Sequence, residues 1–211
     1  MTQSNQSQNN ILQFIHDKTI NGTGDSEKHL LTLYSLVIGQ GSKNILELGV
    51  RDGGTTTPLL AAAQITGGHL TSIDINEIPE IPPGFDKTPD NWTRIQMNAL
   101  DYLAALTTYS KEKFDFIYLD DWHSFEHVSD ELRCLDKLVG PSSIIVIHDL
   151  MYNTEPFYHT DLTLKDGQWA NGGPYRAVAE LDNQFWEFAT LPWNNGLTIL
   201  RKKYSGMYHK I

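Results

Sequence analysis

The stretch NILELGVRDGGTTTPLLAAA, residues 44–63, decides the fold. Its first part is a short apolar run that is typical of a buried strand, and LLAAA begins a helix. Between them, Gly49 and Gly53 let the chain turn sharply and let a ligand approach the backbone closely. The spacing is E-x-G-x-x-x-G, so neither the G-x-G-x-x-G dinucleotide fingerprint nor a P-loop is present. A strand, a glycine turn and a helix in this order predict the beginning of a parallel α/β sheet.

The same alternation continues along the chain. Strands are expected at 69–75, 93–97, 114–119, 144–147, 187–191 and 197–202, and helices at 27–39, 99–107, 125–139 and 174–185. Four prolines between residues 76 and 91 favour an irregular crossover, because proline removes a backbone donor and clashes with the preceding helical turn. The predicted fold class is therefore α/β, a mostly parallel sheet with helices on both faces.

The ends of the chain suggest its organisation. Residues 1–10 are polar and are expected to form a disordered tail. The remainder, 11–211, is expected to form a single domain with N-terminal helices over 11–39. Residues 151–173 are too many for an ordinary connection, which predicts a lid-like insertion.

Composition limits the classes of partner. The 211 residues carry 16 Lys and Arg against 26 Asp and Glu, a formal net charge of −10, which argues against nucleic acid or an anionic membrane surface. One cysteine cannot close an internal disulfide, and no apolar run of about 18 residues is present. We therefore expect a cytoplasmic protein that acts on a small molecule, and a homo-oligomer stays open.

Acidic residues follow the next two predicted strands. Asp74 ends the second strand about 20 residues past the glycine turn, where a carboxylate can accept both hydroxyls of a ribose. Asp101 follows the third strand, where a side chain can meet an adenine edge. Each residue alone could equally be a helix cap or a loop carboxylate. Features at three successive strand ends together favour a nucleotide-like ligand.

These segments resemble the motifs of class I S-adenosylmethionine-dependent methyltransferases: ILELGVRDGG the first, SIDI the second and QMNALDYL the third. The resemblance covers roughly residues 27–201 and implies a Rossmann-like sheet of seven strands with the last one antiparallel. It also implies S-adenosylmethionine as cofactor. Its methionine part would lie near Glu47, Gly49 and Gly53, its ribose near Asp74, and its adenine near Asn98 or Asp101.

A second polar group lies at two later strand ends. Asp120 follows one strand, and the pair His148-Asp149 follows the next. Adjacent parallel strands are about 4.8 Å apart, so these side chains can converge. Two carboxylates and an imidazole form a suitable set of three ligands for a divalent cation. Asp121 is the alternative to Asp120, although the two-residue repeat of a strand places only one of them inward.

This part resembles the metal-dependent O-methyltransferases of the catechol type, and also a broad bacterial methyltransferase group with an Asp-x-x-His-Ser-aromatic-Glu pattern. The resemblance implies that Asp120, His148 and Asp149 hold the metal and that His123 stands where a lysine base stands. His148 replaces a carboxylate of the family pattern. Either the metal is one that accepts imidazole better than Mg²⁺ does, such as Mn²⁺, or His148 is not a ligand.

The predicted function is methyl transfer from S-adenosylmethionine to a small-molecule acceptor, most simply at oxygen, with His123 and Asp120 as catalytic residues and a divalent metal assisting. The alternatives are a catalytically silent protein that binds S-adenosylmethionine, a metal-independent methyltransferase, and a metal-dependent hydrolase on a similar scaffold. His127 is discounted as a partner of His123, since Ser124 is expected to begin the helix between them. The remaining histidines are expected at the surface: His16, His29, His69, His159 and His209.

Overall fold

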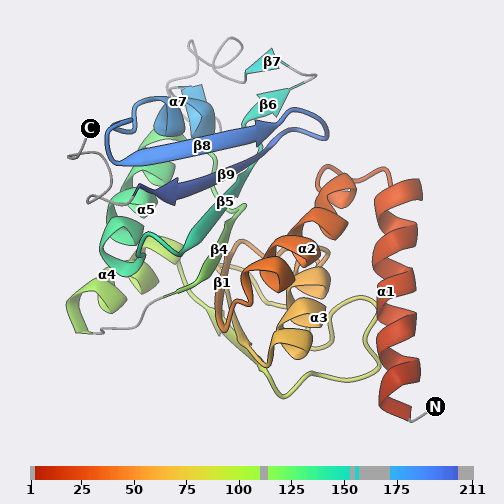
Figure 1. The fold of residues 1–211 in the computed structure, drawn as a ribbon. Helices are drawn as coiled ribbons and strands as arrows, with labels where there is room; N and C mark the ends of the chain where they lie inside the picture. Colours follow the sequence, from red (N-terminus) through yellow and green to blue (C-terminus); the bar gives the residue numbers. More distant parts are fainter. Residues whose placement is uncertain (1–2, 110–113, 153–154, 157–171, 204–211) are drawn as a thin grey trace, which may run out of the picture. The chain divides into compact units, whose positions relative to one another are not determined.

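The computed structural model describes residues 3–109, 114–152, 155–156 and 172–203, which contain both strands and helices (Figure 1). The strands are β1 (Asn44–Leu48), β2 (His69–Asp74), β3 (Trp92–Gln96), β4 (Phe116–Leu119), β5 (Ile144–His148), β6 (Met151–Tyr152), β7 (Glu155–Pro156), β8 (Trp186–Leu191) and β9 (Leu197–Lys202). The helices are α1 (Gln3–Asn21), the 3-10 helix η1 (Glu27–His29), α2 (Leu30–Gln40), α3 (Thr56–Thr66), α4 (Ala99–Tyr109), α5 (Phe125–Leu138) and α7 (Gly173–Ala179).

Seven strands form one sheet in the order β3-β2-β1-β4-β5-β9-β8, and β6 pairs with β7 separately. β2 is parallel to both β1 and β3, and β4 is parallel to β5. β9 runs antiparallel to β5 and to β8. The predicted Rossmann-like α/β fold is therefore confirmed, with the last strand of the sequence as the reversed one.

The chain divides into two compact units, Met1–Ala99 and Leu100–Ile211. The single domain expected over 11–211 stays a prediction. The lid-like insertion expected over 151–173 falls mostly outside the described residues, which include β6 and β7 of that segment. Within the described part of the chain, no helix combines the length and the apolar character that crossing a membrane requires.

The first unit contains α1, α2 and α3. Ile11 and Ile15, one helical turn apart on α1, are buried against Leu30 and Ala61. α1 begins at Gln3, so the described part of residues 1–10, where the sequence predicts a disordered tail, is helical in the structure. Burial of Ile11 and Ile15 holds the later part of α1 in place. Each residue added before them then gains one backbone hydrogen bond, so the polar residues at the start of the helix can also be helical.

The helix expected over 27–39 is divided between η1 and α2, and Ser26 forms no side-chain cap hydrogen bond. His29, expected at the surface, is fully buried where the two helices meet. The tighter turn of a 3-10 helix changes the direction of side chains relative to an α-helix, which a single helical repeat cannot predict. His16 and His69 are exposed as expected, while His159 and His209 lie outside the described residues.

Between β2 and β3, residues 76–91 contain neither helix nor strand, as their prolines predict. In the second unit, α5 packs against α7 and buries an apolar row of Val128, Leu132, Leu135 and Leu138. α7 ends at Ala179, earlier than the predicted residue 185. α5 begins where expected, since the Ser124 hydroxyl accepts a hydrogen bond from the His127 backbone N–H at 3.3 Å.

Candidate functional site

The glycine turn after β1 has the backbone that its sequence predicts. Gly49 has φ of 86° and Gly53 has φ of 81°, values in the left-handed region that favours glycine. The Gly49 N–H donates to the Ile73 carbonyl at 2.9 Å, and the Gly53 N–H donates to the Val50 carbonyl at 2.9 Å. Arg51 between them also has a positive φ, 57°, which is uncommon for a residue with a side chain. The turn is thus held in one strained shape, as is often found in ligand-binding loops.

Glu47 supports this turn from inside the protein. Its side chain is fully buried, and its carboxylate accepts hydrogen bonds from three hydroxyls: Thr55 at 2.9 Å, Thr56 at 2.8 Å and Ser72 at 2.6 Å. These hydroxyls come from the start of α3 and from β2. The carboxylate therefore ties β1, β2 and α3 together around the turn, a structural role that sequence reasoning did not assign to it.

Asp74 faces the turn from the end of β2. Its Oδ2 accepts hydrogen bonds from the backbone N–H groups of Val50 at 2.8 Å and Arg51 at 3.0 Å, and its Oδ1 accepts one from Asn76 at 2.8 Å. Burial raises the pKa of Asp74, but these N–H groups lower it more, so the pKa lies below its ordinary value. The carboxylate stays ionised and, with about four lone pairs in all, keeps acceptor capacity beyond these three bonds.

The two residues expected near the adenine lie at the beginning of α4. Asn98 directly precedes the helix and is half-buried. Asp101 lies in the first helical turn and is exposed. Their role toward an adenine stays a prediction.

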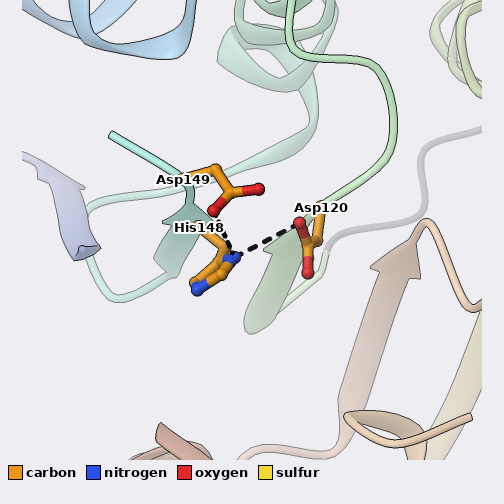
Figure 2. A group of neighbouring side chains, drawn as sticks. All are labelled: Asp120, His148 and Asp149. Carbon is orange, nitrogen blue, oxygen red and sulfur yellow. Dashed lines mark ion pairs between the residues drawn. The ribbon is translucent and has the colours of Figure 1, made fainter. Parts of the chain in front are cut away.

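In the second unit, Asp120, His148 and Asp149 converge as the strand spacing predicts (Figure 2). β4 and β5 are paired in parallel up to Leu119 and Ile147, so the residues that follow meet at one edge. The Nδ1 atom of His148 lies 3.4 Å from Asp120 Oδ1 and 3.2 Å from Asp149 Oδ1. His148 and Asp149 are buried, and Asp120 is partly exposed.

His123 lies against the same carboxylates. Its Nε2 is 3.2 Å from Asp120 Oδ1 and 3.3 Å from Asp149 Oδ2, and its ring is buried. The Tyr118 hydroxyl donates to Asp120 Oδ2 at 2.8 Å, a contact that the sequence analysis missed. The signal was present, because Tyr118 stands two residues before Asp120, on the same side of an extended chain.

The loop between β8 and β9 completes this group. The His148 Nε2 atom lies 3.0 Å from the carbonyl oxygen of Asn194, and the Asp149 N–H donates to the Gly196 carbonyl at 3.1 Å. Asn194 has φ of 50° and Asp149 has φ of 64°, so both residues adopt left-handed backbone. The two strands that this loop joins were expected from the sequence, but its contact with His148 was not.

The contact with Asn194 fixes the chemistry of the His148 ring. A carbonyl oxygen can only accept, so Nε2 carries a proton, and a neutral ring would then direct the lone pair of Nδ1 toward two carboxylates. Either a second proton or a cation must therefore lie at Nδ1. Burial lowers the pKa of His148, but the charge of Asp120 raises it well above its usual value. Conversely, burial raises the pKa of Asp120, but His148 and His123 lower it far more.

The same atoms fit a divalent cation. One ligand atom from each of Asp120, His148 and Asp149 lies within 4.8 Å of the other two. Among the described residues, the buried Oδ1 of Asp149 accepts no hydrogen bond. Two carboxylates and one imidazole suit metals such as Mn²⁺ or Zn²⁺. Asp121, the alternative ligand, instead contacts His127, with 2.9 Å between Oδ2 and Nε2.

Comparisons with known structures find the same fold. An O-methyltransferase from Bacillus cereus in complex with SAH (S-adenosylhomocysteine) is 20% identical, with 94% of this chain and 91% of that chain covered and a TM-score of 0.69. SAH-bound Podospora anserina methyltransferase PaMTH1 is 19% identical, with coverage of 92% and 88% and a TM-score of 0.61.

The MycE methyltransferase of the mycinamycin biosynthetic pathway, in complex with Mg, SAH and mycinamycin VI, is 16% identical. Its TM-score is 0.58, and the alignment covers 86% of this chain and 50% of that one.

No curated protein sequence matches. Residues 46–150 match the family model of a methyltransferase domain. Together with the strand order, this match shows that the chain belongs to the class I S-adenosylmethionine-dependent methyltransferases.

Proposed function

We propose that this methyltransferase acts on an oxygen of a small molecule with the assistance of a divalent cation held by Asp120, His148 and Asp149. The observation that carries the proposal is the position of His148 Nδ1, which faces carboxylate oxygens at 3.4 and 3.2 Å while Nε2 is directed at a carbonyl. The O-methyltransferase and Mg-bound structures with the same fold support it. Two further properties remain predictions from the sequence: a small-molecule acceptor and a cytoplasmic location. Whether the protein forms a homo-oligomer stays open.

The first unit supplies the residues proposed to bind the cofactor, apart from Asp101, which belongs to the second unit. Gly49 and Gly53 allow close approach of the methionine part to the backbone, and Glu47 fixes the turn through its three hydroxyl contacts. Asp74 would accept the ribose hydroxyls while its bonds to the turn hold it in place. Asn98 or Asp101 would contact the adenine.

The second unit supplies the residues proposed to act on the acceptor. When bound, a divalent cation lowers the pKa of an acceptor hydroxyl. Asp120 and Asp149 orient the His123 ring through Nε2, and His123 is proposed to take the acceptor's proton. His148, fixed by Asn194, directs Nδ1 toward the cation.

Methyl transfer without a metal is the alternative that the same geometry allows, because a second proton on His148 satisfies both carboxylates. Assays with radiolabelled S-adenosylmethionine and a pool of small hydroxyl compounds separate the two, if the protein is first stripped with EDTA and then supplied with Mn²⁺ or Mg²⁺. Product that requires the added metal and is lost in Asp149→Asn supports the proposal. Equal product with and without metal establishes the alternative.

Calorimetry with S-adenosylhomocysteine tests the cofactor assignment separately. We expect binding that Asp74→Ala abolishes and that Asp149→Asn preserves, since the two residues have different proposed roles. Absence of binding at millimolar ligand would remove the proposed function as a whole.

A further inference from the structure

The second unit contains a second cluster of side chains that can bind a metal ion. Asp121 lies in the loop before α5, and His127 and Glu131 lie on that helix. The His127 Nε2 atom lies 2.9 Å from Asp121 Oδ2 and 3.6 Å from Glu131 Oε1. His127 and Glu131 are four residues apart, so they share one face of the helix. Ser124 fixes where α5 begins and thereby brings this face next to Asp121.

Glu131 is the unusual member of the cluster. Its side chain is 0% exposed, and neither Oε1 nor Oε2 has a hydrogen-bond partner among the described residues. Burying a carboxylate is costly unless it is paired, hydrogen-bonded or bound to a metal. The Nε2 atom of His127 can carry only one proton, and the shorter contact directs that proton to Asp121. The two oxygens of Glu131 therefore point into the cluster without a donor.

We propose that Asp121, His127 and Glu131 form a second divalent-cation site, for an ion that accepts imidazole together with carboxylates, such as Mn²⁺ or Zn²⁺. Ligand bonds of about 2.0–2.2 Å place neighbouring ligand atoms about 2.8–3.6 Å apart, from octahedral to tetrahedral angles, and the separations of 2.9 and 3.6 Å lie within this range. The ion replaces the Nε2 proton, since a histidine ligand is neutral.

The cluster also offers a route for the ion. The side chains of Asp121 and His127 are 18% and 13% exposed, whereas Glu131 lies inside. An ion can thus enter from the side of Asp121 and His127, and water can fill its remaining positions. Because Asp121 adjoins Asp120, an ion here fixes the loop that carries one of the ligands of the first group.

The competing state of the cluster contains a proton and no metal. In the ion-free protein, burial and the charge of Asp121 raise the pKa of Glu131 to about 8, so a protonated carboxyl could share a hydrogen bond within the cluster. The two states differ in a measurable way, because only the first binds a metal ion at these three side chains.

Counting bound Mn²⁺ on the full-length, EDTA-stripped protein distinguishes the two states, using electron paramagnetic resonance of the free ion. We compare Glu131→Gln and His127→Gln with Glu126→Gln, an exposed carboxylate on the same helix, and with Asp149→Asn in the first group. Glu131→Gln and His127→Gln should each weaken the binding of one equivalent more than about 100-fold, because even loss of a residue that only supports a ligand costs about 10- to 100-fold. Glu126→Gln should leave binding unchanged.

A second readout is made on the wild-type protein, so it does not depend on the stability of Glu131→Gln. Mn²⁺ added to the wild-type protein should broaden the ring-proton NMR signals of His127, identified by their absence in His127→Gln. Loss of one equivalent in Glu131→Gln but not in Asp149→Asn supports this site even if the first group binds no metal. Unchanged Mn²⁺ binding in both cluster variants, or unbroadened His127 signals, would overturn the proposal.

Discussion

At the scale of single residues, the protein uses buried carboxylates in two different ways. Glu47 is surrounded by hydroxyl donors and holds a turn, whereas Asp149 faces imidazole nitrogens of His148 and His123. Hydroxyls can satisfy a carboxylate in the protein alone. A protonated imidazole can donate a hydrogen bond to a carboxylate, and a neutral imidazole can instead bind a metal ion together with that carboxylate. Only the arrangement around Asp149 is therefore suited to ion binding.

Replacing Glu47 by Gln tests the first arrangement. The amide offers one oxygen in place of two, so at least one buried hydroxyl loses its acceptor, and we expect the free energy of unfolding to fall by about 1–3 kcal/mol. Urea denaturation measures this change. Glu77→Gln, at an exposed position near β2, should have almost no effect. Equal stability of the two variants would contradict the role assigned to Glu47.

Asp74 makes stability depend on pH in a defined direction. Its pKa in the folded protein lies below the ordinary value of 3.8. The stabilisation by the ionised carboxylate is therefore fully present above that ordinary value and is lost as the pH falls through the lower, folded value. The stability difference between wild type and Asp74→Asn should stay constant from pH 7 to about pH 4 and shrink as the pH falls further. Urea unfolding at several pH values measures it, and a difference independent of pH would refute the assignment.

The left-handed backbone of Asp149 separates the effect of charge from that of conformation. Asn tolerates a positive φ, so a loss of stability in Asp149→Asn measures the removed charge and not backbone strain. A β-branched residue does not, so Asp149→Val should lose roughly a further 1–3 kcal/mol. Thermal unfolding of both variants in EDTA checks this order, and a valine variant as stable as the asparagine variant would show that the strain is absent.

At the scale of secondary-structure elements, α5 begins at a serine cap and carries His127 and Glu131 of the second cluster in its first turns. The cap matters for this cluster because it sets the rotation of the helix and thus the direction of His127 and Glu131. The preceding segment, 120–124, carries Asp120, Asp121 and His123 within five residues, so both polar groups of the second unit depend on where this helix begins.

Ser124→Ala should therefore destabilise the protein by about 1 kcal/mol, since the His127 N–H loses its side-chain acceptor. Ser26→Ala is the matched control, because Ser26 precedes η1 without forming a side-chain cap hydrogen bond. Chemical denaturation of the two variants gives the comparison. A larger loss in Ser26→Ala would be inconsistent with the capping geometry.

At the scale of the whole molecule, the two units carry different parts of the proposed chemistry. The family match over residues 46–150 includes residues of both units.

Ligand binding should stabilise the molecule by mass action. With S-adenosylhomocysteine at 100 times its dissociation constant, the expected gain is about 2.7 kcal/mol, seen as a raised melting temperature. The shift should disappear in Asp74→Ala and persist in Asp149→Asn. A shift that survives in Asp74→Ala would show that the ligand is bound elsewhere.

The sequence by itself determined the order of strands and helices, the glycine turn and the start of α5, because these depend on neighbouring residues: apolar periodicity, positive φ and a capping hydroxyl. It also predicted that Asp120 meets His148 and Asp149, since parallel strands end at a common edge. Only the tertiary structure decided which partners complete the groups. The Asn194 carbonyl reaches His148 from 46 residues away, and Glu131 is enclosed by packing that no local pattern specifies, because such contacts depend on how distant segments fold against one another.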